Sequence, residues 1–408
     1  MAGHAVPWSG PSLTSAKLPL RGSILRVNAH GFTQFLMQPV TTSPEPDHRT
    51  YLERSFVLAR MARHTARPNP AVGCVVVKGG VIVGEGFTQP PGQAHAEVVA
   101  LQQAGEAARG AVAYVSLEPC AHHGRTGPCS DALISAGVVR VVYGMEDPNP
   151  LVCGKGLQRM RDAGIEVIGP VLESEARAVN PGFIRRMTHG LPYVRCKVGM
   201  SLDGRTAMAN GESQWITGPE ARADVQELRA QSCAILTGIG TVLADNPSLN
   251  VRLHDYRGTP PLRVVADSRM QLPSTAQVLA LPGKVLQVGL APHVPAPLSE
   301  AEWEYRQLPA GNGGIDLREL LLMLARDYSC NEVLVEAGAT LSGALLQAGL
   351  VDELITYVAP SLLGHEARAM ALLPGLKSLE QHLRFTFVDV VMLGKDCKIR
   401  SLPAYRAD

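Results

Sequence analysis

The chain has 408 residues, of which 46% are hydrophobic and 18% are charged, and its formal net charge is +1. This length suits two or three globular domains, and a near-neutral chain without clustered Lys and Arg argues against a nucleic-acid-binding surface. No apolar run approaches the roughly 20 residues that span a membrane. The eight scattered cysteines do not form the pattern of a disulfide framework, so we expect a cytoplasmic protein in a reducing compartment.

Residues 1–46 are expected to be an unstructured leader. They contain no acidic residue before Glu45, and their Lys and Arg residues lie among Ser, Thr, Gly and Pro. An acid-poor start of this kind is typical of a transit peptide. A plain tail, or an extension upstream of a true start at Met37, fits the same composition, and these two interpretations are preferred.

From residue 47 to about residue 168, helical and strand patterns alternate, which is typical of an α/β layer. A helix is predicted from Asp47 to the loop Arg67–Pro70, where two prolines require extended backbone. The apolar run 71–77 and residues 81–87 predict a β-hairpin. Further helices are predicted at 95–108, 130–136 with Ser130 as N-cap, and 156–163, and further strands at 112–117, 138–143 and 165–168.

Three residues of this half have the order and chemistry of a zinc site. His95 begins a predicted helix, Cys120 follows a predicted strand, and Cys129 precedes another predicted helix. One imidazole and two thiolates leave the fourth position of a tetrahedral zinc ion for water, as in catalytic sites. Zinc deaminases carry H-x-E and then P-C-x-x-C, with the Glu as general acid and base. The sequence therefore predicts a hydrolytic zinc site with Glu97 as the catalytic residue.

The spacing of the two cysteines departs from that pattern, because eight residues separate them here. The inserted residues include His122 and His123, which could compete as ligands but are interpreted as loop residues near the substrate. Cys129 at a predicted helix N-terminus would be favoured as a thiolate by the helix dipole. A solvent-facing His-x-Glu and two buried thiols are the ordinary alternatives, and the combination of all these residues in order favours zinc.

Longer runs in this half resemble known enzymes. The H-A-E and S-L-E-P-C runs resemble the cytidine-deaminase superfamily. A wider set of motifs is similar to the bifunctional deaminase/reductases of riboflavin biosynthesis, and this similarity extends from about residue 47 to the end. The runs that carry these resemblances are His95–Glu97, Ser116–Cys120, Leu117–Cys129, Arg67–Gly73, Asp147–Pro150 and Gly154–Gly156.

The resemblance implies an N-terminal cytidine-deaminase-like three-layer α/β/α domain (residues 47–189) and a C-terminal dihydrofolate-reductase-like α/β domain (residues 190–408). It implies a zinc hydrolase with one Zn²⁺ per deaminase site and an NADPH oxidoreductase in one chain. The implied substrate is a small phosphorylated pyrimidine, 2,5-diamino-6-ribosylamino-4(3H)-pyrimidinone 5′-phosphate, and Asn69 is placed among its contacts. No nucleic acid or membrane partner is expected, and a homo-oligomer is left open.

The residues of the second half predict a boundary at 180–191, where Pro181–Gly190 contains turn and basic residues, followed by strands at 193–198, 234–237, 262–266 and 333–336. The last strand leads through a small-residue loop, 337–340, into a helix. Such a loop lets backbone N–H groups approach a pyrophosphate, although a tight connection uses the same residues. A Rossmann fold is not supported, because there is no G-x-G-x-x-G. The Pro- and Gly-rich stretch 282–314 matches nothing specific.

By motif position, the resemblance assigns two groups of residues in this half, with Ser268 at the 2′-phosphate of NADPH and Lys197 and Asp203 near the reacting ribose. The NADPH group is Gly199, Trp215, Thr241, Asp245, Ser268, Gly338, Ala339 and Thr340. The substrate group is Lys197, Asp203, Ser213, Arg229, Leu249, Arg252 and Glu336. Two rival functions remain: a nucleoside or RNA deaminase fused to an unrelated nucleotide-binding module, and a binding protein with an inactive second half.

Overall fold

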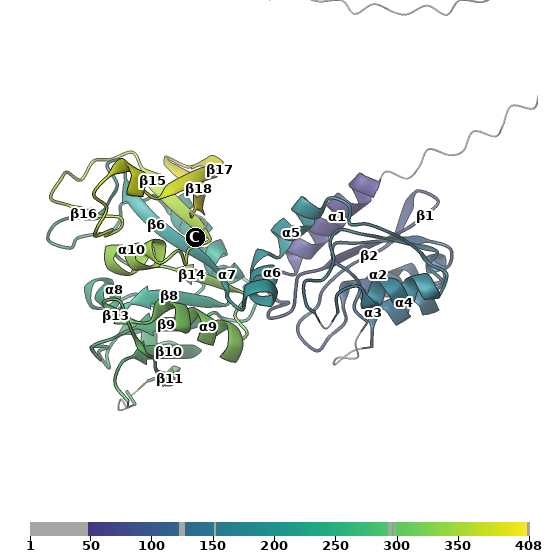
Figure 1. The fold of residues 1–408 in the computed structure, drawn as a ribbon, viewed down its shortest axis with the longest axis horizontal. Coiled ribbons are helices and arrows are strands. Elements are labelled where there is room, and N and C mark those ends of the chain that lie inside the picture. The colour runs from purple at the N-terminus through teal and green to yellow at the C-terminus, as the bar shows by residue number, and fades with distance from the viewer. Residues whose placement is uncertain (1–47, 122–126, 151, 293–295, 298, 406–408) are drawn as a thin grey trace, which may run out of the picture. The chain divides into compact units, whose positions relative to one another are not determined.

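The computed structural model describes residues 48–121, 127–150, 152–292, 296–297 and 299–405. The predicted leader, with its possible start at Met37, and the loop histidines His122 and His123 lie outside the described residues. The described chain contains a five-stranded and a nine-stranded sheet, each with its own helices (Figure 1). Within the described residues, no helix has both the length and the apolarity needed to cross a membrane.

The first sheet has the strand order β2-β1-β3-β4-β5. Strand β1 pairs antiparallel with β2 and β3, whereas β3, β4 and β5 are mutually parallel. Helices α1 and α5 lie on one face, and α2, α3 and α4 lie on the other, as predicted for three layers (Figure 1). The elements are α1 His48–Met61, β1 Gly73–Lys78, β2 Val81–Phe87, α2 Ala96–Ala104, η1 Gly105–Ala108, β3 Val112–Val115, α3 Cys129–Ser135, β4 Arg140–Tyr143, α4 Lys155–Asp162, β5 Glu166–Ile168, α5 Glu173–Val179 and α6 Pro181–His189.

Two glycines of β2 set the position of α2. A Cβ atom on Gly84 would lie 2.1 Å from the carbonyl oxygen of Ala100, and one on Gly86 would lie 2.3 Å from that of Ala96. Any larger residue would push the helix away from the sheet. The close packing therefore fixes the N-terminal end of α2, where His95 and Glu97 are located.

Two sequence predictions in this region were wrong. Ser130 is not an N-cap, because α3 already begins at Cys129 with Pro128 in extended conformation before it, and the Ser130 side chain is buried. The stretch expected to contain turns is helix α6. Proline suits the first turn of a helix, where its missing N–H costs nothing, and Gly190 ends the helix at φ 68°. The same two residue types that suggested turns therefore mark the two ends of a helix.

The second sheet has the order β11-β10-β9-β8-β14-β6-β15-β18-β17. The seven strands from β11 to β15 in this order are parallel. Strand β18 pairs antiparallel with β15, and β17 pairs antiparallel with β18. The main elements are β6 Tyr193–Ser201, α7 Pro219–Gln231, β8 Ala234–Gly238, α8 Ile239–Asp245, β9 Leu262–Ala266, β10 Lys284–Gly289, β11 Glu302–Gln307, α9 Leu317–Asp327, β14 Glu332–Val335, α10 Ala339–Gln347, β15 Glu353–Ala359, β17 Arg384–Leu393 and β18 Asp396–Ala404. Shorter elements are β7 Arg205–Ala207, β12 Ala310–Gly311, β13 Gly314–Ile315 and β16 Arg368–Ala369.

The stretch 282–314, which had no sequence interpretation, supplies strands β10 and β11 at one edge of this sheet. Strand β10 is buried along all but its first residue, as expected for a parallel strand covered on both faces. Its six residues are too short to stand out among the surrounding prolines and glycines. The two sheets do not share a core: buried apolar residues of the first run from Leu52 to Ile184, and those of the second from Leu191 to Tyr357.

Candidate zinc and pyrimidine site

The three predicted zinc ligands come together at one end of the first sheet. His95 immediately precedes α2, Cys120 follows β3, and Cys129 is the first residue of α3. The His95 Nδ1 atom lies 3.2 Å from Cys129 Sγ and 3.7 Å from Cys120 Sγ, and all three ligand atoms lie within 4.8 Å of one another. A tetrahedral zinc ion with typical Zn–S and Zn–N bonds separates its ligand atoms by roughly 3.5–3.8 Å. The donor set and its spacing therefore fit zinc.

The two ligand cysteines share one proton, which favours the thiolate at Cys120 and the thiol at Cys129. A hydrogen bond from the Cys129 thiol lowers the pKa of Cys120 to about 4, and His95 and the Cys129 backbone N–H act in the same direction. Sharing that proton raises the pKa of Cys129 above its usual range. Two adjacent thiolates need a cation between them, so metal binding releases this last proton.

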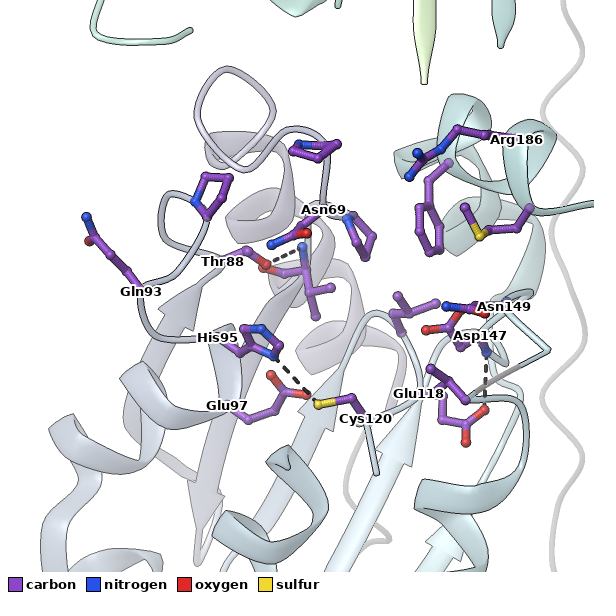
Figure 2. A pocket seen from close by; sticks show the side chains of 18 of the residues that line it. Asn69, Thr88, Gln93, His95, Glu97, Glu118, Cys120, Asp147, Asn149 and Arg186 are labelled. Atoms are coloured by element: carbon purple, nitrogen blue, oxygen red, sulfur yellow. Dashed lines mark hydrogen bonds between the residues drawn. The ribbon is translucent and has the colours of Figure 1, made fainter. Parts of the chain in front are cut away.

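Glu97 lies in the first turn of α2, next to the ligand cluster (Figure 2). It is only 3% exposed. Burial, followed by the negative charge of Cys120, raises the pKa of Glu97 to about 7. A carboxyl group whose pKa lies near neutral pH can both accept and return a proton, which is the behaviour required of a general acid and base.

A cavity of about 480 Å³ opens above His95, Glu97 and Cys120. Its size is within the range of pockets that hold small organic ligands. Asn69, which the sequence placed near the substrate, lines this cavity. Sequence reasoning gave no role to six further polar lining residues, of which three lie in motifs that had been noticed. These are Thr88, Gln93, Glu118, Asp147, Asn149 and Arg186.

Glu118, the residue between β3 and the Pro119–Cys120 ligand turn, holds the next loop against the site. Its carboxylate accepts hydrogen bonds from the backbone N–H groups of Asp147 at 3.2 Å and Gly154 at 3.1 Å. A Cβ atom on Gly156 would lie 1.9 Å from the carbonyl oxygen of Pro119, so the start of α4 packs directly on this turn. Cys120 is therefore held in place by the two residues before it. Glu118 binds the loop that begins at Asp147, and Pro119 packs against the start of α4.

In the second half, three of the predicted substrate residues lie in one connected group. Glu336, mostly shielded from solvent directly after β14, accepts from Arg229 at 2.5 and 3.0 Å and lies 4.0 Å from the ammonium of Lys197. Burial opposes ionisation of Glu336, but Arg229 and Lys197 outweigh it and lower its pKa. Arg229 also donates to the carbonyl of Asn250 at 2.9 Å, which joins the loop that contains Leu249 to this group.

The remaining predicted substrate residues have different surroundings. Arg252 donates to two neutral oxygens, Ser248 Oγ at 3.3 Å and Asn250 Oδ1 at 3.1 Å. Ser213 donates to the carboxylate of Asp245 at 3.0 Å, which links a predicted substrate residue with a predicted NADPH residue.

Asp203 has structural partners. Its carboxylate accepts from Ser201 Oγ and from the backbone N–H groups of Leu363 at 3.1 Å and Gly364 at 2.8 Å. These hydrogen bonds lower its pKa to about 2, with Ser201 making the largest contribution. The carboxylate therefore ties two loops together, and its role near the ribose stays a prediction.

Most of the predicted NADPH residues come after the carboxyl ends of parallel strands, where ligands bind in open α/β sheets: Thr241 and Asp245 after β8, Ser268 after β9, and Gly338–Thr340 after β14. The first turns of α8 and α10 meet there, because Thr241 Oγ1 accepts from the backbone N–H of Gly338 at 3.1 Å. Ala339 and Thr340 are the first two residues of α10, so their N–H groups are free of partners within the helix. This is the geometry in which small residues admit a pyrophosphate.

Gly199, Trp215 and Ser268 complete the predicted NADPH group. A Cβ atom on Gly199 would be 3.6 Å from Thr217, so a side chain there would occupy the space beside that residue. The Trp215 ring is 68% exposed, with the Arg222 guanidinium 4.5 Å from its centroid. Ser268 follows β9, and its hydroxyl accepts from the backbone of Ile315 at 3.2 Å, which leaves its proton available to a ligand.

Comparison with known proteins agrees with both halves. The family model for the cytidine and deoxycytidylate deaminase zinc-binding region matches residues 45–145, and that for the RibD C-terminal domain matches residues 192–399. The riboflavin biosynthesis protein RibD of Escherichia coli is 49% identical over 361 residues, which cover 85% of this chain and 96% of that protein. The chain belongs to the RibD family. RibD of Haemophilus influenzae is 46% identical over 86% of this chain and 96% of its own length.

Two solved structures support the fold of both domains. Acinetobacter baumannii RibD superposes with a TM-score of 0.80 at 47% identity and covers 88% of this chain and 99% of its own. A Thermotoga maritima protein, described as a diaminohydroxyphosphoribosylaminopyrimidine deaminase/5-amino-6-(5-phosphoribosylamino)uracil reductase, gives 0.78 at 32% identity with the same coverage. The predicted cytidine-deaminase-like and dihydrofolate-reductase-like domains are thereby confirmed, as are the zinc and NADPH cofactors and the riboflavin-biosynthesis deaminase and reductase activities of the RibD family.

Proposed function

We propose that this chain carries out two consecutive reactions on one phosphorylated pyrimidine. The first is hydrolytic deamination of 2,5-diamino-6-ribosylamino-4(3H)-pyrimidinone 5′-phosphate. The second is NADPH-dependent reduction of the ribosyl side chain to ribityl, which gives 5-amino-6-(5-phosphoribitylamino)uracil. The main support is the buried Glu97 carboxylate beside the His95, Cys120 and Cys129 cluster at the floor of a cavity, in a chain that also contains a reductase domain.

In the first reaction, zinc held by His95, Cys120 and Cys129 would lower the pKa of water toward ~7. Glu97 accepts one proton from the attacking water and passes it to the ring nitrogen. It then accepts the second proton, from the hydroxyl group now bonded to the ring carbon, and passes it to the amino group, which leaves as ammonia while the carbonyl forms. The burial of Glu97 keeps bulk water from competing for these protons. Asn69 lines the same cavity, and in this proposal its side-chain amide donates to a pyrimidine substituent.

In the second reaction, NADPH supplies the hydride, and the protein supplies position and charge. Glu336 holds the Arg229 guanidinium by two hydrogen bonds and lies within ion-pair distance of Lys197. This arrangement fixes two cations at the carboxyl edge of the sheet, where we place the ribose and the phosphate. Arg252 lies in the adjoining loop and has only neutral acceptors among its hydrogen bonds, so it is suited to the phosphate.

The proposed function is tested by metal content and by turnover on three candidate substrates. We expect about one zinc per chain, ammonia release from the phosphorylated pyrimidine, and oxidation of NADPH that follows ammonia release. Cytidine and tRNA serve as the comparison substrates. Deamination of either at a rate similar to that of the phosphorylated pyrimidine would contradict the proposal and favour the nucleoside or RNA deaminase.

The two activities are expected to be separable at residues 189 and 190. Because the buried cores of the two sheets do not overlap in sequence, each half has an apolar core of its own. A fragment 48–189 should bind zinc and release ammonia, and a fragment 190–408 should oxidise NADPH with the deaminated product. Assays of both soluble fragments check this, and inactivity of both would show that the active sites require the intact chain.

Arg252→Ala is expected to raise the reductase KM for its pyrimidine substrate about tenfold to a hundredfold, because a hydrogen bond to a charged group contributes ~1.5–3 kcal/mol. The KM for NADPH should be nearly unchanged. Ser268→Ala is the matched comparison and should raise the KM for NADPH while sparing the pyrimidine. Titration of both ligands with both variants decides between these assignments, and an effect of Arg252→Ala on NADPH alone would reverse them.

We also propose that the protein is cytoplasmic, because all eight cysteines lie in the described residues and none of them forms a disulfide. A homo-oligomer remains a prediction that light scattering would test.

A further inference from the structure

One basic side chain lines the deaminase cavity without a role in the chemistry described above. Arg186 belongs to α6, and its guanidinium lies at the side of the cavity opposite His95, Glu97 and Cys120 (Figure 2). Its Nε atom is buried and has no hydrogen-bond partner in the described part of the chain. Unpaired polar atoms are costly to bury, so a guanidinium in this state is suited to an anionic ligand.

Arg186 is a basic side chain in a cavity whose other charged lining is mainly acidic. Three carboxylates line the described wall, those of Glu97, Glu118 and Asp147. Glu97 lies at the zinc-ligand cluster, and Glu118 is bonded to the backbone of the next loop. Burial lowers the pKa of Arg186, and none of the effects that oppose this shift comes from a carboxylate. A phosphate entering this cavity would therefore find its favourable charge at Arg186, away from the acidic floor.

We propose that Arg186 binds the 5′-phosphate of the substrate in the deaminase site. The pyrimidine then lies over Glu97, and the ribose spans the middle of the cavity between Glu97 and Arg186. This inference rests on the proposed function, and it adds a phosphate subsite in the deaminase domain that is separate from Arg252 in the reductase domain. A planar guanidinium with several N–H donors matches phosphate oxygens better than a single ammonium group does.

The test compares phosphorylated and dephosphorylated pyrimidine substrates in the full-length, zinc-loaded enzyme. Arg186→Gln should raise the deaminase KM for the phosphorylated substrate about tenfold to a hundredfold, because it removes a charged hydrogen bond. It should leave the KM for the dephosphorylated substrate nearly unchanged. Arg186→Lys should recover part of the loss, since the charge is kept but the paired donors are not. Zinc content and reductase kinetics should match those of the wild type in both variants.

Arg185→Ala provides the matched control on the same helix. Arg185 is paired with Asp352 at 3.2 Å and is not part of the cavity lining. This variant should not distinguish the two substrates. If Arg186→Gln weakens both substrates equally, or if Arg185→Ala discriminates between them as Arg186→Gln does, Arg186 acts through helix packing and the phosphate assignment is overturned.

A second measurement separates this inference from the proposed function. Calorimetric titration with ribose 5-phosphate should show that Arg186→Gln loses one binding site that the wild-type enzyme has. If the wild type deaminated neither pyrimidine, the proposed function would fail, while loss of that sugar-phosphate site in the variant would still support the subsite. Identical titrations of wild type and variant would refute the subsite whichever pyrimidine is turned over.

Discussion

Glu97→Gln is expected to reduce deamination by about 10²–10⁴-fold while zinc binding and the reductase activity persist, because a positioned acid/base group contributes this much. The amide has nearly the shape of the carboxyl group but cannot carry the proton from water to the pyrimidine. Glu97 is not among the three zinc ligands, so the metal site should remain intact. Ammonia release, zinc stoichiometry and NADPH oxidation, measured on one preparation, test these three expectations together.

The reductase activity in the same chain provides an internal control for folding, if it is assayed with deaminated substrate. Glu106→Gln provides a second control, because Glu106 lies in the short η1 turn after α2 and is exposed. The Glu106→Gln substitution also replaces a carboxylate by an amide, but at a position that does not line the cavity. The deamination rate of this variant should equal that of the wild type. Turnover near the wild-type rate in zinc-loaded Glu97→Gln would show that another group carries the proton.

The zinc cluster could be predicted from the sequence because each ligand belongs to a local pattern. His95 and Glu97 lie at the start of one helix, and Cys120 follows one strand. Strands β2 and β9 have the predicted bounds, since short apolar runs between turn residues define them without help from the rest of the fold. Chain order and spacing were therefore sufficient for this part of the site.

The cavity wall could not be predicted in the same way, because it is assembled from distant segments. Arg186 is separated from Glu97 by almost 90 positions, and nothing in its immediate sequence indicates a pocket. Helix α6 itself was mistaken for turns, since Pro and Gly are common both in turns and at helix ends. Residues of this kind become candidates only when tertiary structure shows what they face.

The reductase residues show a third situation, in which motif position identifies a residue but not its contacts. Arg229 and Glu336 were both assigned to substrate binding, and the structure shows that their side chains form two hydrogen bonds with each other. Asp203 was placed near the ribose, and its carboxylate accepts from its own and a neighbouring loop. A buried charge such as that of Arg229 needs a partner of this kind, and none of these partners can be read from spacing alone.

Cys120→Ser and Cys129→Ser are each expected to lose most of the bound zinc, whereas Cys153→Ser should keep it. A serine hydroxyl is a much poorer zinc ligand than a thiolate, because it is not ionised near neutral pH. Cys153 is exposed and lies outside the cluster, so it is the matched control for replacing sulfur by oxygen. Metal analysis of the purified variants, with zinc-dependent thermal stabilisation as a second measurement, checks this expectation.

Cys74→Ser extends the comparison to a cysteine near the site. Cys74 is fully buried in β1 and is not part of the ligand cluster. Burial, and then the nearby charge of Glu97, raises the pKa of its thiol. The serine hydroxyl, buried in place of the thiol, would cost about 1–3 kcal/mol of stability. The zinc content of the folded protein should nevertheless be normal. Zinc retained by Cys129→Ser, in contrast, would mean that His122 or His123 completes the coordination, and would require a different assignment of the third ligand.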